Sequence, residues 1–164
     1  MNEPARKERN KERLSECFPA FAQKVKAVIQ EMEDQGFRPR IQEAHRSIAD
    51  QLIAFKNHKS RVKFGFHNVT GANGEPEALA VDLLDDDDPL DPPREYEIRL
   101  AATAKRNGLQ TGIFFDLAES LRPKLSQAIE DLNFDRSVKI GFDPTHLEVT
   151  GITIQEAKEG KRPK

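Results

Sequence analysis

At 164 residues with a formal net charge of −2, the chain is long enough for one compact domain and too short for two large ones. Charged residues make up 33% of it and nearly balance in sign, so no strong field favours nucleic acid or an anionic membrane as a partner. The lone cysteine, Cys17, cannot form an internal disulfide, and no apolar run approaches the roughly 20 residues needed to span a bilayer. We therefore expect a soluble, disulfide-free monomer with no stable membrane association.

Both ends of the chain are rich in charge. Residues 1–16 contain no uninterrupted apolar segment and no small-residue cleavage site, which predicts that no secretory signal is present and that the protein is cytoplasmic. The composition predicts a flexible arm at residues 1–16 and a flexible tail at residues 154–164. The folded domain is accordingly expected to span residues 17–153.

The first predicted helix lies in the segment FPAFAQKVKAVIQEMEDQG. Apolar side chains recur there every three or four positions, as one buried helical face requires. They are Phe18, Phe21, Val25, Val28, Ile29 and Met32. Pro19 suits the first helical turn and Gly36 suits the C-terminal cap, so the sequence bounds this helix at both ends.

A short strand in residues 38–44 is predicted next, followed by a helix in residues 47–56 that Ser47 caps. Residues 68–77 hold glycines, asparagines and a proline, a composition typical of a turn-rich loop. Residues 78–84, ALAVDLL, are predicted to form a largely buried strand that contains one acid.

The C-terminal half alternates further helices and strands. Pro93 and Gly108 bound another predicted helix, and residues 122–133 form a shorter one. Residues 137–152 are predicted as two strand pieces joined by a turn at Asp143-Pro144. The mixture predicts an α+β fold, with helices packed around a small central antiparallel sheet in a single compact domain.

The acid in the apolar strand, Asp82, is the first candidate for chemistry. A carboxylate is costly to bury unless it is paired, hydrogen-bonded or bound to a metal. His67 and His146 are available as partners, although a single histidine beside an apolar strand is more often structural. Two histidines and one aspartate with a position left open suit a hydrolytic zinc centre.

Two acids flank His146. Asp143 lies three residues before it, with Pro144 stiffening the turn, and could stand beside an attacking water as a general base. Glu148 lies two residues beyond it and shares its face in a strand. The pattern leaves Glu148 open as a ligand, a second base or a partner of the histidine.

The segments FGFHNVTG, ALAVD and GFDPTHLEVTG resemble the zinc peptidase family that includes D-alanyl-D-alanine carboxypeptidases, D-Ala-D-Ala dipeptidases and the L-alanyl-D-glutamate endopeptidases of phage endolysins. The family pattern S-x-H-x-x-G-x-A-x-D, followed by D/E-x-x-H, matches His67, Ala80–Asp82 and Asp143–His146. EAHRSIADQ resembles the family segment Y-R-S-x-x-x-Q, with Arg46 at the arginine. The resemblance runs from about residue 18 to residue 150.

The resemblance implies that His67, Asp82 and His146 bind zinc, that Asp143 is the general base and that Arg46 steadies the substrate carbonyl or the oxyanion. It implies bacterial peptidoglycan stem peptides as substrates. The favoured activity is an endolysin-like L-alanyl-D-glutamate endopeptidase that leaves the cytoplasm for the cell wall. The alternatives are a D,D-carboxypeptidase or dipeptidase of the same family, or a zinc-stabilised binding protein without turnover.

The chain departs from the family pattern at three places. Gly65 replaces the serine, and the loop at residues 68–77 lengthens the spacing between His67 and Asp82, which costs little free energy. The chain has no tryptophan, and residues 108–116 stand where the family has a Trp-Gly pair. The acidic run at residues 85–91 lacks EF-hand spacing and is expected to be a solvated loop.

Overall fold

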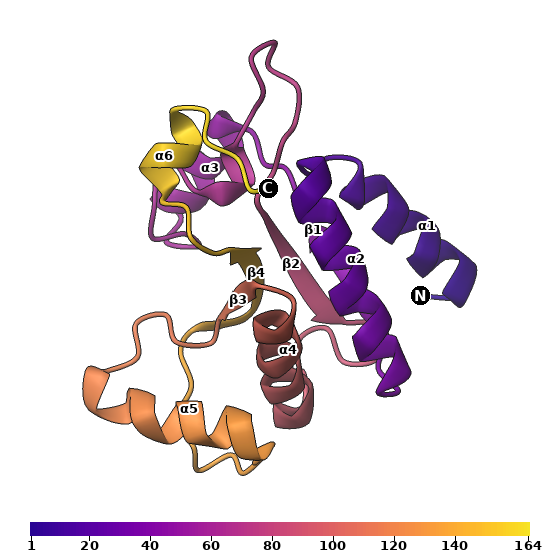
Figure 1. Ribbon diagram of the computed structural model, residues 1–164, viewed down its shortest axis with the longest axis vertical. Helices are drawn as coiled ribbons and strands as arrows, with labels where there is room; N and C mark the ends of the chain where they lie inside the picture. Colours follow the sequence, from indigo (N-terminus) through magenta and orange to yellow (C-terminus); the bar gives the residue numbers. More distant parts are fainter.

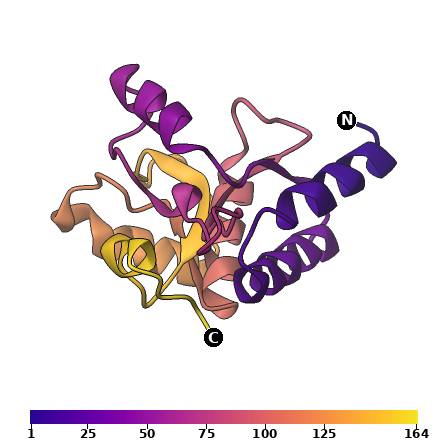
Figure 2. The same ribbon diagram turned by 90° about the horizontal axis from the view of Figure 1, so that it is seen from above.

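The structure is a computed structural model that describes residues 1–164 and combines helices with a four-stranded sheet (Figures 1 and 2). The strands are β1 (Pro39–Glu43), β2 (Ala80–Asp85), β3 (Leu109–Gly112) and β4 (Asp143–Val149). The helices are α1 (Glu3–Leu14), α2 (Pro19–Asp34), α3 (Ile48–Lys56), α4 (Arg94–Arg106), α5 (Arg122–Asp131) and α6 (Ile154–Lys158), with short 3-10 helices η1 (Phe66–Asn68) and η2 (Glu119–Leu121). The strands run in the order β1-β2-β4-β3 and every pairing is antiparallel, so the predicted α+β fold is confirmed.

The helices divide into groups around the sheet. Figure 1 shows α1 and α2 beside the β1 end and α4 and α5 beside the β3 end, whereas α3 and α6 overlap at the upper left of this view but lie apart in Figure 2. α2 is amphipathic as predicted, because Phe21, Val25, Val28 and Met32 are fully buried. No helix has both the length and the apolar character that crossing a membrane requires.

The buried apolar side chains form two clusters. The large cluster has 22 buried residues, and it joins α2 to the central strands. The small cluster has eight buried residues between α4, α5 and the loops beside them. The sheet therefore rests on one extensive core, while a smaller core supports its β3 end.

Residues 1–16 differ from the expected flexible arm. Asn2 caps α1 by accepting a hydrogen bond from the backbone of Ala5, at 2.9 Å. Arg6 is only 1% exposed, and its guanidinium donates to the carbonyl of Pro39 at 2.6 Å. Asn10 donates to the same carbonyl, at 3.0 Å, so a polar helix is held against β1 by long-range hydrogen bonds that composition alone does not predict.

The expected flexible tail is also ordered. Thr153 caps α6 in a capping box with Glu156, and Arg162 pairs with Glu77 at 2.6 Å. Arg162 also donates to the carbonyl of Thr70 at 2.8 Å. These contacts join the C-terminal segment to the base of the loop between η1 and β2.

A third correction concerns the predicted turn at Asp143-Pro144. Both residues belong to β4, and residues 137–142 form a loop instead of a strand. That loop crosses close to the segment after β3, because a side chain at Gly141 would lie 2.4 Å from the carbonyl oxygen of Phe115. Pro144 is tolerated in a strand because it stands at a shift in register, where no ladder hydrogen bond is required.

Candidate metal centre

His67 is positioned by η1, a single tight turn, and not by a strand. Asn68 holds this turn, since its side chain accepts from the backbone of Gly65 at 2.7 Å and donates to the carbonyl of Arg46 at 2.8 Å. The His67 ring lies with Nδ1 2.6 Å from the carbonyl oxygen of Ala44. The turn is therefore fixed against the residues that follow β1, and the second ring nitrogen, Nε2, is left to face the sheet.

Asp82 and His146 are brought together by strand pairing. They are direct partners in the register of β2 and β4, which places their side chains side by side on one face of the sheet. The turn that carries His67 lies next to β2, because Leu79 donates its backbone N–H to the carbonyl of Phe66 at 3.0 Å. Three segments far apart in the sequence thus meet at one point.

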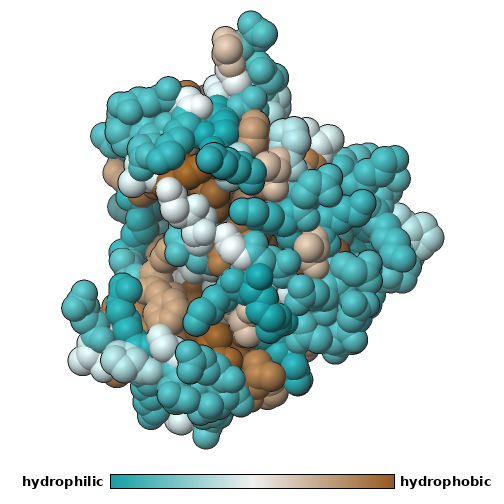
Figure 3. All heavy atoms as spheres, in the orientation of Figure 1, coloured by the Kyte–Doolittle hydropathy of each residue, from teal (hydrophilic) through white to brown (hydrophobic).

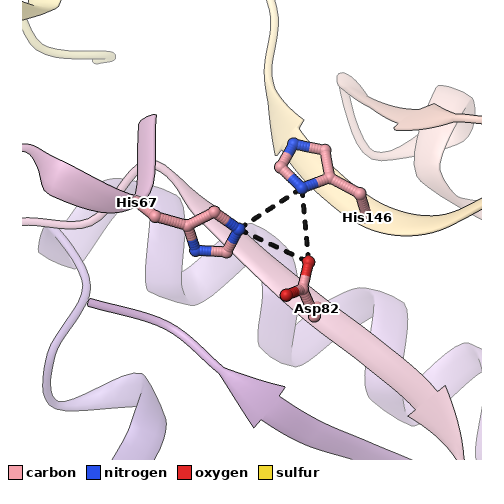
Figure 4. A group of neighbouring side chains, drawn as sticks. All are labelled: His67, Asp82 and His146. Atoms are coloured by element: carbon pink, nitrogen blue, oxygen red, sulfur yellow. Dashed lines mark hydrogen bonds and ion pairs between the residues drawn. The ribbon is translucent and has the colours of Figure 1, made fainter. Parts of the chain in front are cut away.

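The three side chains form a compact triangle (Figure 4). His67 Nε2 lies 3.3 Å from His146 Nδ1 and 3.4 Å from Asp82 Oδ1, and the remaining side, from His146 Nδ1 to Asp82 Oδ1, is 3.3 Å. Ligand atoms at about 2.0–2.1 Å from a tetrahedral zinc ion are about 3.3–3.4 Å apart, so the triangle has the size of one tetrahedral face. The donor set fits a divalent metal ion.

Each histidine has one nitrogen held and one directed into the triangle. A proton on His67 Nδ1 is donated to the carbonyl of Ala44, which leaves the Nε2 lone pair free. The His146 ring is turned the other way, since its Nε2 lies 2.8 Å from Glu148 Oε2 and its Nδ1 faces the triangle. Gln110 completes the support by donating to the other Glu148 oxygen at 2.8 Å. Glu148 is therefore a partner of the histidine, the third of the roles left open by the sequence.

The residues of the triangle also shift one another's pKa values. Burial lowers the pKa of His146, but its hydrogen bonds with Asp82 and Glu148 outweigh burial and raise that pKa to about 10. Burial alone would raise the pKa of Asp82, yet hydrogen bonds from His146 and His67 hold it well below its usual value. A divalent ion bound in the triangle would compete with a proton on His146, because metal-ligating histidines must be deprotonated.

Asp143 lies at the start of β4, on the same side as His146. Residues three apart on a regular strand face opposite sides of a sheet. Here β3 pairs at Thr111 with Leu147 but at Gly112 with Asp143, and this shift in register breaks the alternation. Burial raises the pKa of the Asp143 carboxyl; His146 opposes that shift, and the neighbouring Asp82 adds to it. The carboxyl is thereby suited to accepting a proton.

Arg46 is held in place by two partners. Its Nε donates to Glu43 at 2.8 Å and its Nη1 to Gln51 at 2.9 Å. Gln51 is buried and donates to the carbonyl of Val62 at 2.7 Å, which ties the arginine to the loop after α3. The sequence match at Arg46 and Gln51 thus corresponds to a real contact, whereas the pairing with Glu43 has no signal in the pattern.

All five predicted site residues line one cavity of about 590 Å³, termed here the metal cleft: Arg46, His67, Asp82, Asp143 and His146. Figure 3 shows hydrophobic surface in the hollow between the upper and lower lobes on the left, whereas the lobes themselves are mostly hydrophilic. Three lining residues lie outside every segment that the sequence analysis singled out as chemical: Lys59, Arg61 and Arg122. Phe115, Asp116 and Phe142 also line the cleft and were given no role by the sequence.

The fold and the cleft together define an α+β protein with a His-Asp-His cluster suited to a divalent metal. The structure is similar to the crystal structure of the L-Ala D-Glu endopeptidase ChiX of Serratia marcescens, with a TM-score of 0.55 over 87% of this chain and 86% of that chain. The two sequences are 15% identical, so this likeness shows a shared fold. No family model matches the chain, and no curated protein matches it significantly by sequence.

Proposed function

We propose that this protein is a zinc-dependent peptidoglycan peptidase that cleaves the stem peptide of the bacterial cell wall, as an L-alanyl-D-glutamate endopeptidase. The observation that carries the proposal is the triangle of His67, Asp82 and His146 on the wall of a cleft, in a fold similar to that of such an endopeptidase. The same residues are those that the sequence resemblance assigns to zinc.

Each polar residue of the metal cleft has a separate role in hydrolysis. Zinc held by the triangle would supply Lewis acidity and lower the pKa of a water molecule to about 7. Asp143, whose pKa is raised by burial, accepts the proton of the attacking water and returns it to the leaving amine. Arg46, held by Glu43 and Gln51, presents its remaining N–H groups to the oxygen of the carbonyl under attack.

The proposal is tested by mass spectrometry of purified peptidoglycan after incubation with the protein, with and without a chelator. Chelator-sensitive fragments with a new D-Glu amino terminus are expected. Loss of terminal D-Ala alone would move the activity to a D,D-carboxypeptidase. Absence of cleavage in several wall types by the zinc-loaded protein would favour a binding protein.

The role of Asp143 is tested by substitution. Asp143→Ala is expected to retain zinc and to lose about 10²–10⁴-fold in rate, the usual cost of removing a general base. Asp91→Ala is a matched control, because Asp91 is 80% exposed and stands outside the metal cleft. Equal rates for the two variants would remove Asp143 from the mechanism.

A further inference from the structure

A second hollow, of about 460 Å³, lies beside the metal cleft, between β3 and α5. The two cavities share Phe115 and Arg122 in their walls, so they are neighbours separated by a single aromatic side chain and one arginine. Figure 1 shows α5 below the sheet, with β3 between it and the strands that carry the metal triangle. A peptide bound at the triangle therefore has room to continue past Phe115.

The charges of the two cavities differ. The metal cleft is lined by four carboxylates, Asp82, Asp116, Asp143 and Glu148, and by four Arg and Lys side chains. The second hollow is lined by Lys105 and Arg122 and by no acidic residue. Its remaining wall is mostly apolar, so these two cations face a surface of low polarity. Such a hollow favours an anionic group with a hydrocarbon stem.

Arg122 has donors to spare. Its Nε and Nη2 approach the carbonyl oxygens of Leu117 and Phe114 at 3.3 and 3.5 Å, and no carboxylate pairs with it. A guanidinium has five N–H donors, so several stay available for a carboxylate. By contrast, Arg46 pairs with Glu43 and Arg61 pairs with Asp116 at 2.7 Å. Arg122 is thus the arginine of the shared wall that can accept a new anionic partner.

The strand beside the second hollow also suits a peptide. Gln110 and Thr111 line the hollow and belong to β3, an edge strand of the sheet, beside which an extended peptide can lie.

We propose that the second hollow is a substrate subsite, in which Arg122 binds a free carboxylate next to the scissile bond. This proposal rests on the proposed function, since it places a peptide in the metal cleft. Its substrates are stem peptides whose D-Glu residue keeps a free α-carboxylate, and peptides amidated at that position bind weakly.

The test measures binding separately from hydrolysis. Zinc-loaded Asp143→Ala protein is titrated by calorimetry with the synthetic peptide L-Ala-γ-D-Glu-L-Lys, with the D-Glu α-carboxyl either free or amidated. The free acid is expected to bind about 10- to 100-fold more tightly, as the loss of one charge-assisted hydrogen bond implies. Arg122→Gln in the same background should abolish this preference and leave affinity for the amide within about twofold.

A control variant separates the subsite from general effects. Lys124→Ala removes a neighbouring charge on α5 that lines neither cavity, and it should keep the preference for the free acid. Equal affinity for the two peptides in the parent protein, or a preference that survives Arg122→Gln, overturns the subsite. If the protein does not hydrolyse peptidoglycan but still binds the free-acid peptide more tightly than the amide, the proposed activity is rejected and the carboxylate subsite is retained.

Discussion

The large and small core clusters support different parts of the cleft. Phe66, Val81 and Leu147 belong to the large cluster and are direct sequence neighbours of the three residues of the metal triangle. Ile113 and Ile129 belong to the small cluster and line the second hollow. Leu109 of the large cluster also lines the second hollow, so the division is not complete. Changes in the large cluster are expected to act mainly on metal retention, and changes in the small cluster mainly on substrate binding.

The largest effect is expected from removing a residue of the triangle. His67→Ala should abolish stoichiometric zinc binding. Removing a direct ligand is expected to lower zinc affinity by more than the about 10–100-fold that is lost when a residue hydrogen-bonded to a ligand is removed. Metal content is measured on purified protein, with circular dichroism to confirm folding. The control is His58→Asn, at an exposed histidine whose positive φ of 57° asparagine tolerates. Stoichiometric zinc in His67→Ala would exclude His67 as a ligand.

Two matched core substitutions test the comparison directly. Leu83 in the large cluster and Leu125 in the small one are both fully buried, so each change to alanine should cost about 2–5 kcal/mol in the free energy of unfolding. Leu83→Ala should also weaken zinc binding, because Leu83 follows Asp82 on β2. Leu125→Ala should keep zinc affinity and raise KM for the peptide. Denaturant unfolding, metal titration and kinetics check these outcomes, and parallel losses of zinc in both variants would refute the division.

A smaller effect is expected at the support of His146. Glu148→Gln keeps the size of the side chain and weakens its hydrogen bond to His146 Nε2, so zinc affinity should fall by about 10–100-fold. Gln110→Ala, one step further away, should lower the affinity less. Competition with a chromophoric chelator measures both. Unchanged affinity in Glu148→Gln would show that the carboxylate does not orient the ring.

The smallest effect is expected for the pH dependence of the packing of α1 beside β1. Hydrogen bonds from Arg6 and Arg38 lower the pKa of Glu3 from 4.5 to about 2. Because the folded-state pKa is depressed, the ionised form is favoured on folding; its contribution is complete above pH 4.5 and disappears as the pH falls through about 2. Hydrogen exchange of the α1 amides should therefore accelerate over this range. Glu3→Gln should remove most of that pH dependence, and a profile identical to that of the unmodified protein would refute the assignment.

Local signals predicted the central helices well, but they missed α1, α6 and the edge strand β3. The apolar stripe of α2 and the Ser47 cap of α3 depend on neighbouring residues, so the sequence contains them directly. β3 is short, and its sequence LQTG has neither alternation nor strong β-propensity. It forms because β4 offers a partner, a long-range cause that the local pattern lacks.

The candidate site shows the same division. The triangle follows from motifs at His67, Asp82 and His146, since strand pairing and a tight turn realise their spacing. The cations of the second hollow lie on α4 and α5 and meet only through packing. No motif marked Arg122, because its relevance arises from the absence of a carboxylate partner beside it, whereas Lys105 lies 3.9 Å from Glu130.

The loop between His67 and Asp82 closes on itself before it reaches the sheet. Glu77 donates its backbone N–H to Val69 at 3.0 Å, and a bridge joins Thr70 to Pro76, so the tip projects away from the strands at the top of Figure 1. The distance between His67 and Asp82 therefore does not depend on the number of residues in the loop between them. Evolution can vary this length freely, and the tip is a natural point for grafting a foreign domain. A segment inserted between Asn73 and Gly74 is expected to leave zinc affinity unchanged, as a metal titration would verify.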